Sequence, residues 1–136
     1  QGKKDGKKIL GLETVEFQAD MLYNMHSIRK QAEQLMEMVN DPQKSIDEAN
    51  ELTKAYFAQD MQKMYEFSIE CESDPVFFEK LLLNRNADWI TKLPSIMSEG
   101  SSFIAVGCLH LVGEYGLIKM LRDRGYVVEA IGYSQN

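Results

Sequence analysis

The chain has 136 residues, of which 44% are hydrophobic and 26% are charged, as is usual for a folded protein with one hydrophobic core. Its formal net charge of -6 argues against a nucleic-acid-binding protein, because such proteins contact phosphates through clustered Lys and Arg side chains. The sequence has no run of about 20 apolar residues that could span a membrane, and its first residues lack the basic-then-apolar pattern of a signal segment. We expect a single domain over residues 1–136, with a flexible start at residues 1–6.

The first apolar run, residues 7–12, is short and bounded by glycine and polar residues, which favours a buried strand. From Val15 the apolar residues take the spacing of an amphipathic helix, which we expect to end before Pro42. A second long helix, antiparallel to the first, is expected to begin with Ser45 and Glu48 as a capping box. The apolar side of the first helix carries Met21, Met25, Ile28, Ala32, Leu35, Met36 and Val39.

Two further helices are predicted in the middle of the chain. Asp74 followed by Pro75 is typical of a helix start, because Asp caps a helix well and proline is tolerated at its first position. The next helix, around Trp89, is expected to be kinked or split at Pro94 and to end at Gly100. The apolar side of the third helix carries Phe77, Phe78, Leu81 and Leu82.

The last third of the chain has the pattern of a strand, a helix and a strand. Residues 102–107 and 126–131 are short runs rich in apolar residues, and a helix ended by Gly125 separates them. This order implies a parallel pair of strands with a right-handed crossover. We therefore predict an α/β fold: a small, mainly parallel sheet with strands near 7–12, 102–107 and 126–131, and a large insertion of long antiparallel helices.

Two polar residues follow the predicted strands, where ligands of parallel sheets usually bind. Glu13 follows the first strand, and His110 lies three residues after Gly107, a glycine that could permit a sharp turn. A carboxylate and an imidazole at one sheet edge can hold a divalent metal or transfer protons, so both are candidate catalytic and metal-binding residues. The same pattern also fits a structural histidine. An imidazole buried with both nitrogens hydrogen-bonded would count against the metal-binding pair.

Arg85 and Asn86 are expected between two helices, and two interpretations are open for them. In the first, the arginine forms an ion pair on the protein surface. In the second, both residues bind a substrate, because a guanidinium group binds carboxylates and phosphates in a bidentate manner. The other histidine of the chain, His26, lies beside the apolar side of the first helix and is expected to have a packing or surface role.

Several motifs, taken in chain order, resemble the second half of TraB/GumN proteins. They are the segment GLET at residues 11–14, Leu83-Asn84-Arg85-Asn86 followed by Trp89, and VGCLHLVGEYGLIKMLRDRGY at residues 106–126. The resemblance covers nearly the whole chain, and the final block is its most specific part. The family is similar to the Tiki-type metalloproteases and, more distantly, to erythromycin esterases.

The resemblance implies an α/β fold of two halves, each with a GxxH motif, in which the glutamate of GLET completes a metal-dependent hydrolytic site. His110 would be the histidine of the second motif, Glu13 the carboxylate ligand or base, and Arg85 with Asn86 the supporting polar pair. The implied cofactor of the full-length parent is a divalent metal such as Zn, Mn or Co. A catalytic zinc usually takes three protein ligands, so we expect this chain alone to bind metal weakly and to hydrolyse little.

The resemblance also implies partners, a location and two alternative functions. The partner would be an N-terminal half of the same protein, for which a second copy in a homodimer could substitute, and the location would be the periplasm or cell envelope of a bacterium. The leading function is that of a metal-dependent hydrolase or peptidase acting on a peptide. The alternative is a noncatalytic or regulatory module that binds a peptide such as a signalling pheromone, since TraB-type relatives are associated with pheromone shutdown.

Overall fold

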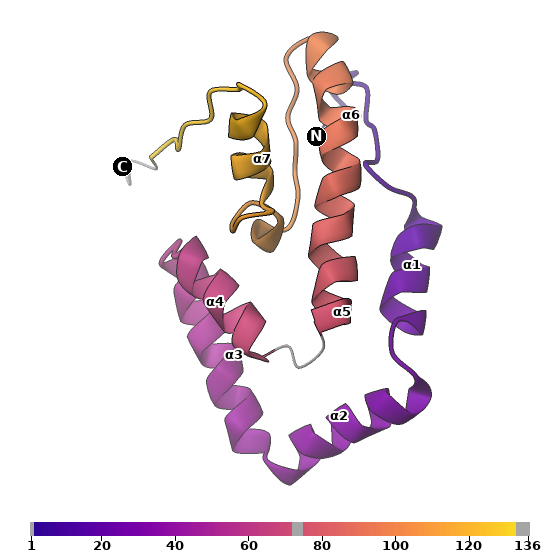
Figure 1. The fold of residues 1–136 in the computed structure, drawn as a ribbon, viewed down its shortest axis with the longest axis vertical. Coiled ribbons are helices and arrows are strands. Elements are labelled where there is room, and N and C mark those ends of the chain that lie inside the picture. The colour runs from indigo at the N-terminus through magenta and orange to yellow at the C-terminus, as the bar shows by residue number, and fades with distance from the viewer. Residues whose placement is uncertain (1, 72–74, 133–136) are drawn as a thin grey trace. The chain divides into compact units, whose positions relative to one another are not determined.

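The computed structural model describes residues 2–71 and 75–132, which form helices joined by irregular segments (Figure 1). Contacts between Cα atoms divide the chain into two compact units, Gln1–Pro42 and Gln43–Asn136. The expectation of a single domain stays a prediction. None of the helices in the described ranges is both long and apolar enough to cross a bilayer.

The first unit contains α1 (Val15–Asn24) and α2 (Ile28–Asn40). The single long helix expected here is therefore interrupted, because Ser27 caps a new helix. Its Oγ accepts a hydrogen bond of 3.2 Å from the backbone N–H of Lys30. This bond satisfies one of the N–H groups that have no partner within the first turn of a helix.

The next two helices are α3 (Pro42–Phe57) and α4 (Met61–Cys71). They are separated at Gln59, whose φ of 57° is incompatible with a continuing helix. Asp60 then accepts a hydrogen bond of 3.0 Å from a backbone N–H in the first turn of α4, so it acts as the cap of that helix. Ser45 lies inside α3 rather than at its start, so the predicted capping box is wrong.

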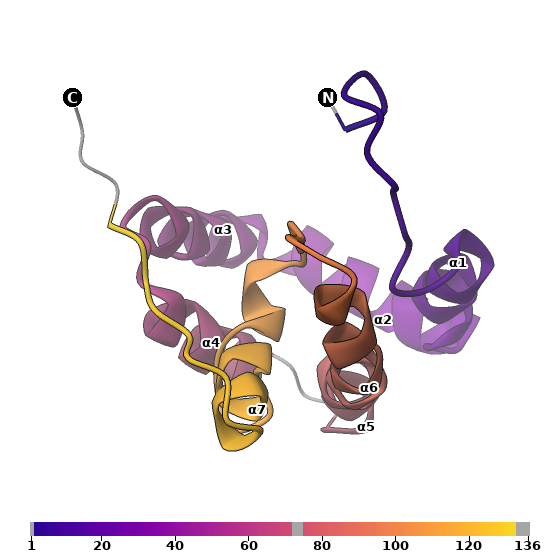
Figure 2. The same cartoon turned by 90° about the horizontal axis from the view of Figure 1, so that it is seen from above.

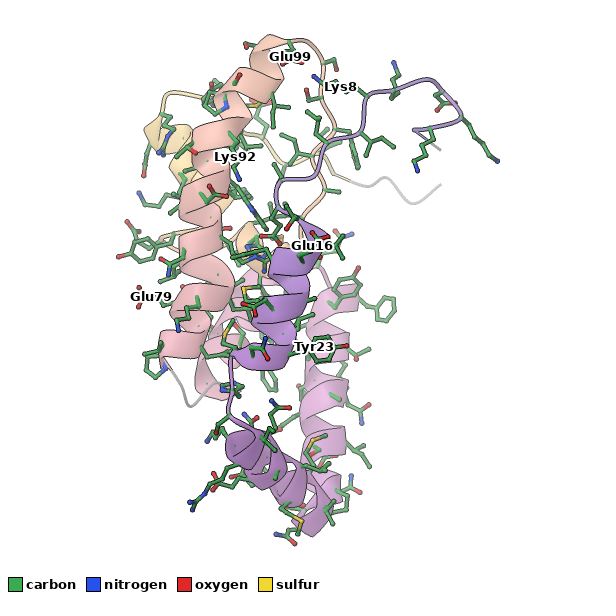
Figure 3. All side chains as sticks on the ribbon, turned by 90° about the vertical axis from the view of Figure 1, so that its right-hand side faces the viewer. Lys8, Glu16, Tyr23, Glu79, Lys92 and Glu99 are labelled. Atoms are coloured by element: carbon green, nitrogen blue, oxygen red, sulfur yellow. The ribbon has the colours of Figure 1, made fainter. Side chains whose placement is uncertain are left out.

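A continuous helical run follows, consisting of α5 (Pro75–Phe78), the π-helical turn η1 (Glu79–Leu83) and α6 (Asn84–Ser98). The helix does begin at the proline that was expected to start it, whereas its expected cap, Asp74, lies outside the described residues. Pro94 lies inside α6 without ending it. Glu79 and Lys92 of this run, and Glu99 directly after it, are labelled in Figure 3.

After α6 the chain forms the short 3-10 turn η2 (Cys108–His110) and then α7 (Leu117–Asp123). Helices α6 and α7 are in contact and lie side by side in Figures 1 and 2. Gly125 follows α7 with φ +87°, the left-handed conformation expected of a glycine just beyond a helix end. The buried hydrophobic residues of the second unit are Ala55, Met64, Leu82, Trp89, Ile90, Leu93 and Leu117.

The predicted α/β fold is wrong. Within residues 2–71 and 75–132 no residue belongs to a strand, and residues 7–12, 102–107 and 126–131, apart from short bends and turns, have no regular structure. A strand exists only where its N–H and C=O groups pair with those of a neighbouring segment, and a short apolar run does not specify such a neighbour. The runs are not buried either, since Phe103 and Ile131 are each 95% exposed.

Candidate functional site

The first two turns of α6 place a polar residue on an otherwise apolar face. The buried residues of this helix follow the i, i+3, i+4, i+7 spacing of one helical face, so Asn86 lies in line with the hydrophobic ones. Asn86 is only 2% exposed. A buried amide must find hydrogen-bond partners, and it finds them in the loop that contains η2 and precedes α7.

His110 is the last residue of η2 and is 6% exposed. Gly107, before this turn, has φ -60° and ψ 144°, which any residue can adopt. A Cβ added there would lie 3.6 Å from Cδ2 of the His110 ring, an ordinary van der Waals distance. The sharp turn expected from the glycine of the GxxH pattern is therefore not what positions this histidine.

The amide of Asn86 determines which ring nitrogen of His110 carries the proton. Its Nδ2 donates to two backbone carbonyl oxygens, that of His110 at 3.1 Å and that of Tyr115 at 2.7 Å. Its Oδ1 lies 2.7 Å from Nδ1 of His110 and can only accept, so Nδ1 carries the hydrogen. The neutral imidazole then keeps its lone pair on Nε2.

Arg85 lies on the other side of the imidazole. Its Nη1 is 3.2 Å from Nε2 of His110 and also donates to the carbonyl oxygen of Leu81 at 3.0 Å. The guanidinium carbon lies 4.8 Å from the centre of the Trp89 ring, a cation–π distance. The Trp89 and His110 ring centres are 4.4 Å apart. We call these four residues, Arg85, Asn86, Trp89 and His110, the His110 cluster.

Trp89 contributes an unsatisfied donor to the His110 cluster. Its indole Nε1 is buried and has no hydrogen-bond partner among the described residues. A buried donor left in this way costs about 1–3 kcal/mol. Since nearly all buried polar groups in folded proteins are paired, this N–H is the natural place in the cluster for an additional acceptor atom.

The His110 cluster does not fit a bound metal ion in this conformation. A histidine binds a metal through a ring lone pair, and the lone pair on Nε2 is directed at the guanidinium of Arg85. That group is a permanent cation, so it would repel a second cation at the same nitrogen. Both ring nitrogens of His110 are hydrogen-bonded and the ring is buried. This arrangement counts against the predicted metal-binding pair of Glu13 and His110. Over the described residues, no three His, Cys, Asp or Glu side chains gather in a possible metal site.

The other half of the predicted pair, Glu13, lies in the first unit of the chain, whereas His110 lies in the second. Glu13 Oε1 accepts a hydrogen bond of 2.8 Å from Nε2 of Gln18. This contact ties the carboxylate to the start of α1. The pairing of Glu13 with His110 stays a prediction.

The structure brings together three residues that the sequence marked as candidates, namely Arg85, Asn86 and His110. Trp89, which the sequence marked as part of a helix and of a family motif, is buried and contacts both Arg85 and His110. The hydrogen bond from Asn86 to the backbone carbonyl group of Tyr115 was not predicted, because the pattern of side chains along a sequence does not indicate where a backbone carbonyl group points. One signal was available: Asn86 precedes Trp89 by three residues and so continues the apolar face of α6 by one turn.

A family model described as "TraB/PrgY/gumN family" matches residues 1–130 of the chain. No curated protein and no solved structure matches the chain. The matched range includes Glu13 and the whole His110 cluster, so the resemblance carried by the motifs is confirmed.

Proposed function

The chain belongs to the TraB/PrgY/gumN family, and on this basis we propose that it forms part of a metal-dependent hydrolase or peptidase of the bacterial cell envelope. In this proposal His110 contributes Nε2 as a metal ligand or as a proton acceptor. The observation that supports it is the hydrogen bond between Nδ1 of His110 and Oδ1 of Asn86.

Metal-binding histidines usually donate their second ring N–H to a fixed acceptor, which orients the ring and keeps the coordinating nitrogen unprotonated. Asn86 is such an acceptor, at 2.7 Å, and it is itself held by two backbone carbonyl groups. The same tautomer suits general base catalysis, because Nε2 is then able to take a proton. Asn86 therefore supports either role of His110.

The remaining ligands are also part of the proposal. A catalytic zinc takes about three protein ligands and a water molecule, and His110 supplies one of them. Glu13 supplies a second, and the N-terminal half implied by the family supplies the rest. A bound divalent metal would polarise a substrate carbonyl group and activate water.

Calorimetric titration of the parent protein with Zn, Mn and Co tests this function. We expect stoichiometric binding that is lost in His110→Ala and retained in His26→Ala, the matched control at the second histidine of this chain. Hydrolysis of a peptide should stop in the presence of a chelator. Metal binding that is unchanged in His110→Ala would remove His110 from the proposed site.

A second candidate is a noncatalytic module that binds a peptide. The observation that favours it is the complete hydrogen bonding of the buried His110 ring, which is typical of a structural histidine. Peptide binding measured with and without a chelator separates the two functions. Tight binding that survives the chelator, without hydrolysis, supports the module and contradicts the metal-dependent hydrolase.

A further inference from the structure

We propose that Arg85 blocks Nε2 of His110, and that its guanidinium group must leave this nitrogen before His110 can bind a metal or accept a proton. The functional meaning of this block rests on the role proposed for His110.

The block follows from the geometry of the imidazole. The Nδ1–H tautomer has one lone pair, on Nε2, and that lone pair lies in the ring plane in a single direction. Nη1 of Arg85 is 3.2 Å away and is a donor only, because a guanidinium group stays protonated in proteins. A metal ion or a proton would need the same lone pair. Arg85 and a bound cation therefore exclude each other.

Two further contacts hold Arg85 in the blocking position. Nη1 also donates to the carbonyl oxygen of Leu81 in the π-helical turn, at 3.0 Å. The guanidinium carbon lies over the ring of Trp89, which in turn contacts the ring of His110. Each of these contacts is noncovalent and can be exchanged. A competing acceptor for the guanidinium group, such as a carboxylate group, could therefore draw Arg85 away from Nε2.

The block predicts that the reactivity of His110 depends on Arg85. Diethyl pyrocarbonate modifies unprotonated imidazole nitrogens, and mass spectrometry of the digested chain reports modification of His110 and His26 separately. In Arg85→Met, which keeps a long apolar side chain, the rate at His110 should rise about tenfold or more, as expected for the loss of a hydrogen bond from a charged donor. The rate at His26 is the internal reference.

Arg124→Met is the matched control, because it removes the same charge from an arginine whose contact is with the backbone of Met120. It should leave the rate at His110 unchanged. An unchanged rate at His110 in a folded Arg85→Met variant would overturn the block, since burial alone would then account for the protection. Circular dichroism verifies the fold of both variants.

A measurement on the unmodified chain tests the block without any variant. Nitrogen-15 NMR of the side chain of His110 should show a proton on Nδ1 and an acceptor lone pair on Nε2. A proton on Nε2 would overturn the proposal, because Arg85 could not then donate to that nitrogen.

Zinc titration separates failure of the block from failure of the proposed function. In the parent protein, Arg85→Met should bind zinc about tenfold or more tightly than the unmodified protein if the block and the function are both correct. Equal zinc affinity in the two proteins, together with an equal rate of modification of His110, contradicts the block and leaves the metal function standing. Faster modification of His110 in Arg85→Met, with no zinc binding by either protein, contradicts the metal function and leaves the block standing.

Discussion

The ring of Tyr65 occupies the space in which a side chain at Gly113 would lie. A Cβ added to Gly113 would be 2.5 Å from Cζ of Tyr65, and the φ of Gly113 is +83°. Glycine is therefore needed at this position both for the backbone conformation and for the close approach of α4. The loop fixed in this way contains Tyr115, whose carbonyl group accepts a hydrogen bond from Asn86.

We predict that Gly113→Ala destabilises the protein more than Gly125→Ala. Both glycines have a positive φ, but a Cβ at Gly125 meets no atom within 4 Å, so the second variant measures the conformational cost alone. That cost is about 1–2 kcal/mol, and the contact with Tyr65 should add about 1–3 kcal/mol. Urea unfolding of the two variants measures both values. Equal destabilisation would show that the ring of Tyr65 moves away without cost.

Asn86→Ala should be among the most destabilising single substitutions in the second unit. It removes the donor for two carbonyl groups and the acceptor for Nδ1 of His110; the two bonds to His110 are buried and the bond to Tyr115 is partly buried. We expect a loss of about 2–4 kcal/mol in the free energy of unfolding. Asn24→Ala is the control, because the Asn24 side chain donates to Asp20 at an exposed position; this substitution should cost less than about 0.5 kcal/mol. A similar small loss for Asn86→Ala would refute the network.

Two serines distinguish the helix starts of the structure from those expected from the sequence. Ser27→Ala should cost about 1 kcal/mol, because the hydrogen bond to the N–H of Lys30 is lost. Ser45→Ala should be neutral or slightly stabilising, since Ser45 lies inside α3 and alanine has the higher helix propensity. Thermal unfolding followed by circular dichroism measures both changes. A larger loss of stability in Ser45→Ala than in Ser27→Ala would support the predicted capping box at Ser45.

Glu51 of α3 should titrate below the ordinary glutamate range. A hydrogen bond and an ion pair with Lys54, followed by weaker contributions from Lys63 of α4, lower the pKa of this carboxyl group. A lowered pKa means that the ionised form is favoured in the folded state. The stabilisation is therefore present above the ordinary glutamate pKa and is lost as the pH falls through the lowered value.

Carboxyl NMR titration measures this shift at Glu51. Lys54→Met should raise the pKa towards its ordinary value more than Lys63→Met does, because Lys54 is the larger cause. High salt should act in the same direction, since all three side chains are exposed and the charges are screened. A pKa that does not respond to Lys54→Met would exclude the ion pair as its cause.

The helices were largely predictable because their signals are local. Apolar spacing located α2 and α6, Pro42 limited the end of α2, and Gly125 limited the end of α7. The interruptions were not predictable from spacing, because the cap at Ser27 and the positive φ of Gln59 leave the apolar period almost unchanged. The prediction of strands was wrong for a different reason. A strand needs a second segment to pair with, and a short apolar run does not identify that segment.

The candidate site was predictable in its members but not in its arrangement. Arg85, Asn86 and His110 were identified from their chemical types and from the family motifs, although 25 residues separate the first from the last. Their arrangement depends on the loop before α7. The backbone carbonyl groups of His110 and Tyr115 in this loop accept hydrogen bonds from the Asn86 amide and so fix its orientation. A carbonyl orientation depends on dihedral angles that the sequence of the loop does not report.

The π-helical turn at Glu79–Leu83 lies between α5 and α6 in one continuous helical run. One residue advances an ordinary helix by about 100°, and a π turn accommodates one additional residue without unwinding the chain. Deleting one residue from this turn would therefore leave an ordinary helical turn and change the angular position of α5 little. The deletion would instead shift the carbonyl group of Leu81, which accepts a hydrogen bond from Arg85, so the additional residue of the π turn contributes to the position of the guanidinium group beside His110.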